Sequence, residues 1–137
     1  ACPVTFAFNV QEPLFLSPEQ GNQALFVIQE ALLNAYRHAH ARQIGMELNR
    51  QGQEISISVT DDGIGFEPGS RWWENHQDHF GLGIMHARAA RIGARLQVDS
   101  APGKGARVTL VLPLTENSMR TKYMSDSPKV ISPVQAL

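Results

Sequence analysis

The chain has 137 residues, a length typical of one compact domain that buries a core without disulfides. It carries 12 basic and 13 acidic side chains, a formal net charge of −1, and 42% hydrophobic residues, a balance that argues against a nucleic-acid binder. The single Cys2 excludes an internal disulfide and predicts a reduced thiol in the cytoplasm. No apolar run approaches the roughly 20 residues of a membrane span. Because the chain starts at Ala1 without Met, it is open whether a longer parent protein carries a membrane anchor.

The first two predicted elements are a strand and a long helix. Residues Val4 to Val10 alternate in polarity, which predicts a strand at a sheet edge. Ser17 is placed to cap a helix, with Pro18 at its first position and Gln20 three residues after the cap, as in a capping box. The helix is predicted to run to about Ala39.

Two stripes are predicted on this helix. The apolar stripe is built from residues at three- and four-residue steps, namely Ala24, Leu25, Ile28, Ala31, Leu32 and Ala35. Glu30, Asn34 and His38 rise four residues apart on a second ridge, with Arg37 beside it, so they can address one ligand. An amide oxygen suits Mg²⁺, a carboxylate can take a proton, and cationic groups can meet phosphate. The alternative is an ordinary solvated polar face.

A hairpin and an irregular segment follow. Residues Gln43 to Asn49 and Glu54 to Asp61 are predicted strands joined by a turn at Gly52. Between Glu67 and Phe80 the periodicity disappears, which predicts a long loop of functional or mobile type. Its two Trp residues favour packing of the loop onto the domain, with a partner surface as the alternative.

The last elements are a second helix and a second hairpin. The helix is predicted from Leu82 to Ile92, with Ile84, Ala87 and Ala90 recurring among cationic neighbours, and Gly93 stops it. The strands are predicted at Arg95 to Asp99 and at Ala106 to Leu112. We therefore predict a domain over residues 1–114 and a poorly ordered tail over residues 115–137.

Two glycine motifs carry further chemistry. Asp61 ends a strand, where its carboxylate can accept the amine of a purine, and Gly63 and Gly65 leave room for close backbone approach. A tight turn alone would explain the same residues. Gly81 and Gly83 open the second helix, whose free amides can hold phosphate. Neither motif is a P-loop or a dinucleotide fingerprint, and no His spacing predicts a metal site.

Three segments in this order resemble the ATP-binding catalytic module of bacterial sensor histidine kinases, in the wider gyrase, chaperone, histidine kinase and mismatch-repair ATPase superfamily. Gln29 to Ala39 resembles the Asn-containing box of that module, Asp61 to Phe66 its first glycine box, and His79 to Ala89 its second. The form of the second glycine box resembles the nitrate/nitrite-sensor subfamily. The likeness covers roughly Leu16 to Leu114.

The resemblance implies an α/β fold, a two-layer sandwich with helices on one face of a mixed, mostly antiparallel sheet. It also implies ATP and Mg²⁺ as ligands, Asn34 at the Mg²⁺, Glu30 as base or water organiser, and Asp61 at the adenine. Arg37 and His38 would approach the phosphates. The pocket and its lid would be shaped by Gly63, Gly65, Phe66, Gly81, Leu82, Gly83 and Gly105, with Glu67 to Phe80 as the mobile lid.

Two departures from the family pattern stand out. Ala106 occupies a position where the family often has Thr, which removes a hydroxyl from the expected adenine side. A dimerisation helix with a phospho-acceptor His is missing, so the γ-phosphoryl group would go to a His of another domain, upstream of a response regulator. Two alternatives remain: a degenerate nucleotide-binding or interaction module, and a hydrolysing ATPase, which would need a transducer domain.

Overall fold

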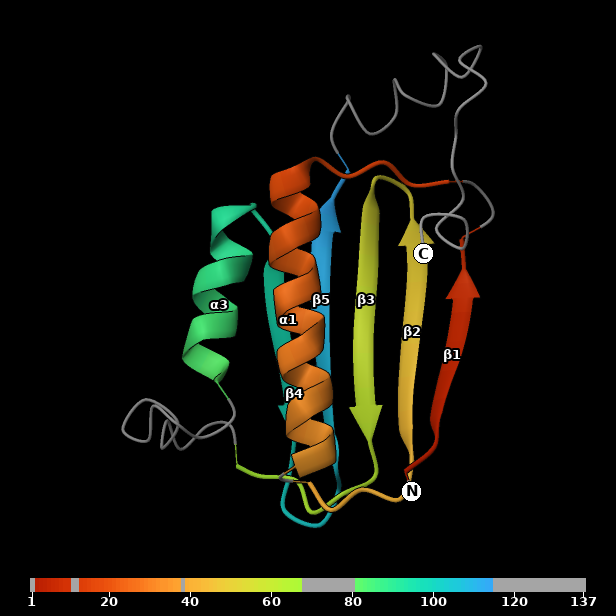
Figure 1. Ribbon diagram of the computed structural model, residues 1–137, viewed down its shortest axis with the longest axis vertical. Helices are drawn as coiled ribbons and strands as arrows, with labels where there is room; N and C mark the ends of the chain where they lie inside the picture. The colour runs from red at the N-terminus through yellow and green to blue at the C-terminus, as the bar shows by residue number, and fades with distance from the viewer. Residues whose placement is uncertain (1, 11–12, 38, 68–80, 115–137) are drawn as a thin grey trace.

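In the part of the chain that the structure describes, five strands form one mixed sheet, and two helices cover part of one of its faces (Figure 1). The computed structural model describes residues 2–10, 13–37, 39–67 and 81–114. The strands lie in the order β1-β2-β3-β5-β4; β1 is parallel to β2 and every other neighbouring pair is antiparallel. The elements are β1 (Val4–Asn9), α1 (Pro18–Arg37), β2 (Ile44–Gln51), β3 (Glu54–Asp61), α3 (Leu82–Arg91), β4 (Arg95–Ser100) and β5 (Ala106–Pro113). The predicted two-layer α/β sandwich is confirmed.

The capping box predicted for α1 is present. The Ser17 hydroxyl oxygen accepts the Gln20 N–H at 3.1 Å, and the Gln20 side-chain oxygen accepts the Ser17 N–H at 3.0 Å. These two bonds satisfy donors that a helix start otherwise leaves open. The helix ends at Arg37, two residues before the predicted end, and the Ala39 N–H closes its last turn on the Asn34 carbonyl.

The predicted apolar stripe of α1 is wrong by one residue at Leu25. The Leu25 side chain is 55% exposed, whereas Val27, which the pattern left out, is 2% exposed. The reason is tertiary: α1 packs on β3 and β5 and lies beside α3, so the stripe around Ala24 and Ala31 faces inward. Leu25 is rotated by about 100° around the helix axis from Ala24, so its side chain lies outside the buried stripe.

The sheet contributes the other half of the core. On β3, Ile55, Ile57 and Val59 alternate inward as predicted, and on β5 Leu110 and Leu112 do the same. Each of these side chains has less than a tenth of its surface exposed. The core therefore lies between the helix layer and the middle of the sheet, with the end of β3 leading out of it toward the glycine-rich turn.

The second helix begins at Leu82 as predicted, but its buried face differs from the predicted recurrence. Leu82, Met85 and Ala89 pack into the core, whereas Ile84 is 51% exposed. Both sets have helical spacing, and Met85 is fully buried in the core. Gly93 follows the helix with φ +66°, the left-handed conformation that glycine adopts without strain.

Two predictions concern segments outside the described residues: the loop beyond Glu67 and the tail from residue 115 onward. In the part of the chain that the structure describes, no helix is long and apolar enough to cross a membrane.

Candidate functional site

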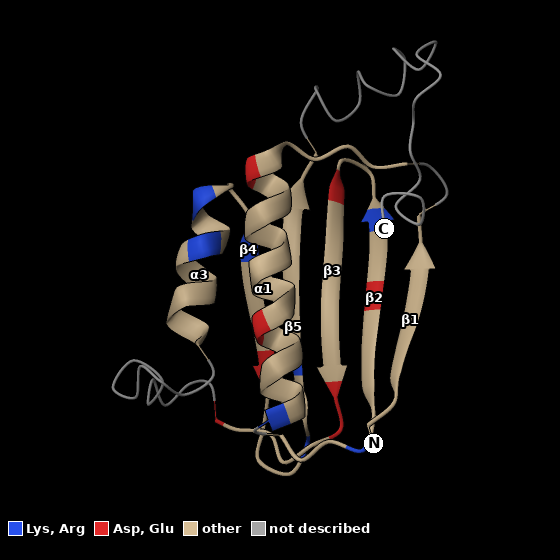
Figure 2. Ribbon diagram, in the orientation of Figure 1, with Lys and Arg blue, Asp and Glu red and all other residues tan. Residues whose placement is uncertain are grey.

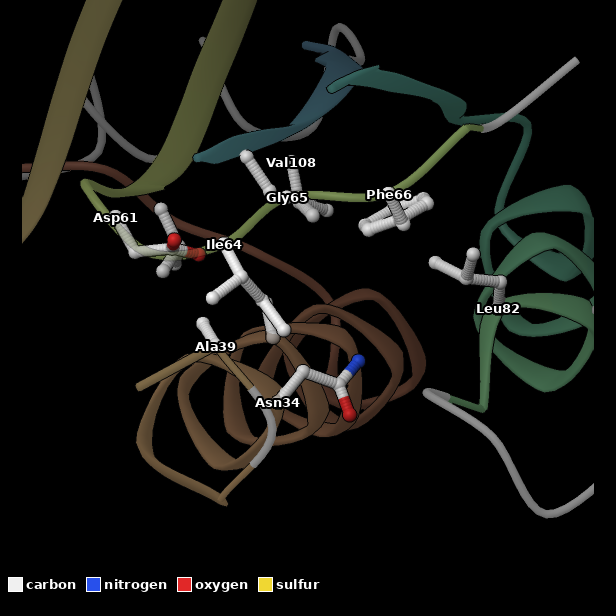
Figure 3. Close-up of a pocket in the computed structure, with 11 residues that line it drawn as sticks. Asn34, Ala39, Asp61, Ile64, Gly65, Phe66, Leu82 and Val108 are labelled. Atoms are coloured by element: carbon white, nitrogen blue, oxygen red, sulfur yellow. The ribbon is translucent and has the colours of Figure 1, made fainter. Parts of the chain in front are cut away.

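A pocket opens between the C-terminal half of α1, the end of β3 and the start of α3 (Figure 3). Its volume is about 440 Å³, including the open mouth. The lining residues come from every layer of the fold: Ala31, Asn34, Ala39, Val59, Asp61, Ile64, Gly65, Phe66, Leu82, Ala106 and Val108. Most of them are small or apolar, and the polar groups are few. Such a lining suits a flat ligand that is held by a small number of specific hydrogen bonds.

Asp61 supplies the charged group of this pocket. It is the last residue of β3, and its carboxylate accepts the Gly63 N–H at 2.8 Å. Burial raises the pKa of the Asp61 carboxyl above its ordinary value of 3.8, while N–H donation by Gly63 and Ala106 works in the opposite direction. The carboxylate has lone pairs beyond those two bonds, so it can accept an exocyclic amine.

Asp62, the next residue, has a different task. Asp62 is not among the pocket-lining residues, and its carboxylate accepts the N–H groups of Arg42, at 2.8 Å, and Gln43, at 3.0 Å. Donation by Gln43 and Arg42 lowers the pKa of the Asp62 carboxyl. The side chain therefore ties the segment before β2 to the end of β3, and it serves as the natural control for its neighbour Asp61.

The turn between β4 and β5 clamps the glycine-rich segment from the other side. The Ser100 hydroxyl accepts the Phe66 N–H at 2.9 Å and donates to the Gly105 carbonyl at 2.7 Å. The Gly103 N–H donates to the Ile64 carbonyl at 2.6 Å. These bonds hold the Ile64–Phe66 wall of the pocket against residues that lie 34 to 39 positions later in the sequence.

Missing side chains make that clamp possible. Gly65 has φ +65°, and a Cβ there would meet the Ala101 carbonyl oxygen and lie 2.8 Å from the Gly105 carbonyl oxygen. A Cβ on Gly105 would meet the Asp61 backbone, with the Asp62 Cα only 3.1 Å away. At Gly63 a Cβ would lie 2.6 Å from that of Ala39. In the described structure these glycines let one backbone approach another.

Of the α1 residues predicted for the site, one lines the pocket and a second lies beside the start of α3. Asn34 lines the pocket itself. Glu30, one turn earlier, lies beside Gly81, where a Cβ would be 3.1 Å from the Glu30 carboxylate oxygen. Arg37 is exposed at the end of α1, and His38 falls outside the described residues.

The start of α3 closes one end of the pocket. Gly81 occupies the N-cap with φ +57° and makes no side-chain capping bond, and Leu82 is buried against the pocket wall. Gly83 is exposed in the first turn and is not among the lining residues. The glycine at the cap leaves space that the Glu30 carboxylate approaches.

Sequence reasoning missed the apolar walls. Val59 and Val108 are paired across β3 and β5 and both face the pocket, together with Ala31 and Ala39. The inward alternation of β3 and β5 was a signal for the two valines. Ser100 had no such signal, because its two hydrogen bonds reach parts of the chain that only the fold brings together.

The polar groups at this site suit Mg²⁺ bound together with phosphate. Among the described residues, no three His, Cys, Asp or Glu side chains gather into a metal cage. Asn34 instead offers one amide oxygen in the pocket, and Glu30, one turn earlier on α1, offers one carboxylate beside Gly81. This set fits a cation that takes most of its ligands from water and phosphate oxygens, as Mg²⁺ does.

Solved structures share this architecture. The catalytic domain of the histidine kinase ThkA aligns with TM-score 0.68 at 12% identity, over 85% of this chain and 81% of that one. A blue-light activated histidine kinase of Erythrobacter litoralis aligns with TM-score 0.65 at 21% identity, over 85% of this chain and 37% of that one. At these identities the likeness shows the fold.

Sequence comparison shows the family. Residues 20–116 match the model described as histidine kinase-, DNA gyrase B-, and HSP90-like ATPase. An uncharacterized sensor-like histidine kinase of Chloroflexus aurantiacus is 38% identical over 95 residues, 66% of this chain and 16% of that protein. The sensor protein VraS of Staphylococcus epidermidis is 31% identical over 119 residues, 85% of this chain and 32% of that protein. The chain belongs to this ATPase family, as an ATP-binding catalytic domain of the histidine kinase type. It spans less than a third of these relatives.

Proposed function

We propose that this domain binds ATP together with Mg²⁺ and donates the γ-phosphoryl group to a His on a dimerisation domain outside this chain. The observation that carries the proposal is the pairing of Asp61 and Asn34 in one otherwise apolar pocket. A carboxylate at the end of β3 suits the adenine amine, and an amide on α1 suits the phosphate and cation end. The parent protein would act in two-component signalling, with a response regulator downstream.

The residues would divide the work as follows. Asp61 accepts the adenine amine and fixes the base between the apolar walls. Asn34 holds Mg²⁺, which neutralises phosphate charge when it is bound. Arg37 and His38 meet phosphate oxygens, and the amides at Gly81 and Gly83 face the same charge at the start of α3. Leu82, Phe66 and Gly105 complete the shape of the site.

The transfer step needs one base. The imidazole nitrogen of the acceptor His attacks the γ-phosphorus, a nitrogen–phosphorus bond forms, and the bond to the bridging β–γ oxygen breaks to release ADP. Glu30 takes the proton of the attacking imidazole or organises a water that does so. Its place beside Gly81 puts the carboxylate next to the α3 start, where the phosphates would lie.

Location and subfamily are also proposals. We place the domain in the cytoplasm, with a parent protein that is either soluble or anchored in the inner membrane with this domain on the cytoplasmic side. The nitrate/nitrite-sensor likeness of the second glycine box stays a prediction. The alternative function is a regulatory module of the same fold that has lost nucleotide binding.

The test is a calorimetric titration with a non-hydrolysable ATP analogue, with and without Mg²⁺. We expect micromolar binding that depends on Mg²⁺ and is nearly abolished in Asn34→Ala. The matched control is Asn22→Ala, an exposed Asn on the same helix, which should bind as the parent does. Absence of binding at millimolar analogue would favour the regulatory module, and normal Mg²⁺-dependent binding by Asn34→Ala would remove Asn34 from the site.

A further inference from the structure

The two edges of the described sheet differ in charge. β4 carries Arg95 and Asp99, and charges on an edge strand discourage pairing with another chain. β1 carries none in Val4–Asn9, contains no Pro, and pairs with β2 in an unbroken register without a bulge (Figure 2). Charges, prolines or bulges usually protect the edge strands of natural proteins against pairing with other chains. Because β1 has none of these features, its edge is available to pair with another strand.

An exposed apolar surface accompanies that edge. Phe6 and Phe8 are 58% and 62% exposed, and their rings stack with centroids 6.3 Å apart and planes within 3°. Val4 precedes them on the same side of the strand and is also exposed. On β2 the paired residues Met46 and Leu48 are half-buried and extend the surface inward. α1 and α3 lie over the other end of the sheet and leave this part uncovered (Figure 1).

The backbone of β1 is oriented to accept another strand at the same residues. The Ile44 N–H donates to the Pro3 carbonyl, so the odd-numbered residues of β1 turn their backbone groups toward β2. The N–H and C=O groups of Val4, Phe6 and Phe8 therefore face the open edge. Within the part of the chain that the structure describes, the β1 residues that expose large apolar side chains are the ones whose backbone groups lie on the open edge.

We propose that β1 is a self-association surface, at which two copies of this chain pair their β1 strands antiparallel about a two-fold axis. With Phe6 opposite Phe6, Val4 of each copy lies opposite Phe8 of the other. All three pairs are hydrogen-bonded pairs, each exchanging two bonds. The register places aromatic and β-branched side chains across from one another, a stabilising cross-strand combination.

A second copy suits the chemistry of this surface. An isologous contact sets the same strand of each copy against the other, so a strand with charges of one sign would repel its copy, whereas β1 is uncharged. A Phe side chain offers roughly 200 Å², so the exposed parts of Phe6 and Phe8 supply about 120 Å² each. The total falls below the ~800 Å² per partner of a standard interface. We expect a weak dimer, with a dissociation constant of roughly 10–1,000 μM.

Sedimentation of the chain from about 10 μM to 1 mM tests the proposal. We expect monomers at the low end and closed dimers at the high end, with at least a ten-fold weaker dimer in Phe8→Lys. The control is Ile84→Lys, which replaces a similarly exposed apolar residue on α3 and should leave the dimer unchanged. Both positions are exposed, so both variants should fold, as a thermal melt will verify.

Monomers throughout, species larger than a dimer, or a dimer unaffected by Phe8→Lys would each overturn the proposal. The surface lies away from the nucleotide pocket, so Phe8→Lys should bind the ATP analogue as the parent does. Self-association and nucleotide binding can thus fail independently.

Discussion

Asp61→Asn gives the sharpest test of the proposed site. The change keeps the size of the side chain and keeps an oxygen that can accept the Gly63 N–H, but it removes the negative charge. A hydrogen bond to a charged group contributes about 1.5–3 kcal/mol, so ATP should bind roughly 10- to 100-fold more weakly. Calorimetry with the ATP analogue at pH 7 measures this loss.

The same change should stabilise the free domain. Burial raises the pKa of Asp61 in the folded state, so the unfolded chain releases this proton at lower pH than the folded one. The resulting penalty is absent below the ordinary pKa of 3.8 and is fully present above the raised pKa. The melting temperature of Asp61→Asn should therefore exceed that of the parent at pH 7. The difference should vanish as the pH falls from above the raised pKa to below 3.8.

Asp62→Asn is the control, with the opposite signature. Donation by Gln43 and Arg42 lowers the pKa of Asp62, so its charge favours the folded state above pH 3.8. Asp62→Asn should lower the melting temperature at pH 7 and leave ATP affinity close to that of the parent. Unchanged ATP affinity in a folded Asp61→Asn would refute the assignment of Asp61 to the adenine, whatever the melts show.

Three further changes test the glycine clamp, the core and the pocket wall. Gly65→Ala should lower the free energy of unfolding, measured by urea denaturation, by more than Gly52→Ala does. Both glycines have positive φ, where an L side chain costs about 1–2 kcal/mol. Of these two positions, only Gly65 would also place a Cβ against a carbonyl oxygen. Val27→Ala should cost about 1.5–2.5 kcal/mol, whereas Leu25→Ala, although a larger truncation, should cost less because that side chain is 55% exposed. Ala106→Thr adds a hydroxyl to the pocket wall and should tighten ATP binding about two- to ten-fold, a gain of roughly 0.5–1.5 kcal/mol, measured by calorimetry; weaker binding would show that the wall has no room for it.

Local patterns predicted the elements well. The strand at Val4, the capping box at Ser17 and both hairpins depend on residues within a few positions of each other, and all are present. The orientation of the helices was harder. Apolar residues occupy more than half of the circumference of α1, so periodicity alone could not decide between Leu25 and Val27. The position of the sheet and of α3 decides it.

The same division holds for the candidate site. Asn34, Asp61, Gly65 and Phe66 were predicted from motifs, and the structure brings them together around one pocket. That prediction depended on the resemblance of the motifs to a known family. Spacing alone was equally compatible with a polar helix face at Asn34 and a simple tight turn after Asp61. The contribution of Ser100 could not be predicted, because a lone Ser at the end of a strand has no distinguishing local pattern.

The contacts in the structure also give a different explanation of why glycine is needed at these positions. The sequence suggested that Gly63 and Gly65 make room for a ligand, but the nearest groups to a Cβ at either position are protein carbonyls, at Ala39 and Ala101. The absent side chain at Gly65 lets the segment after β3 approach the β4–β5 turn, where Ser100 bonds to both segments, and the one at Gly63 lets it approach Ala39 after α1. Asp61 is thus held by a backbone clamp rather than by its own side-chain packing. Any substitution that opens this clamp should weaken the adenine recognition that we propose for Asp61, although its carboxylate is unchanged.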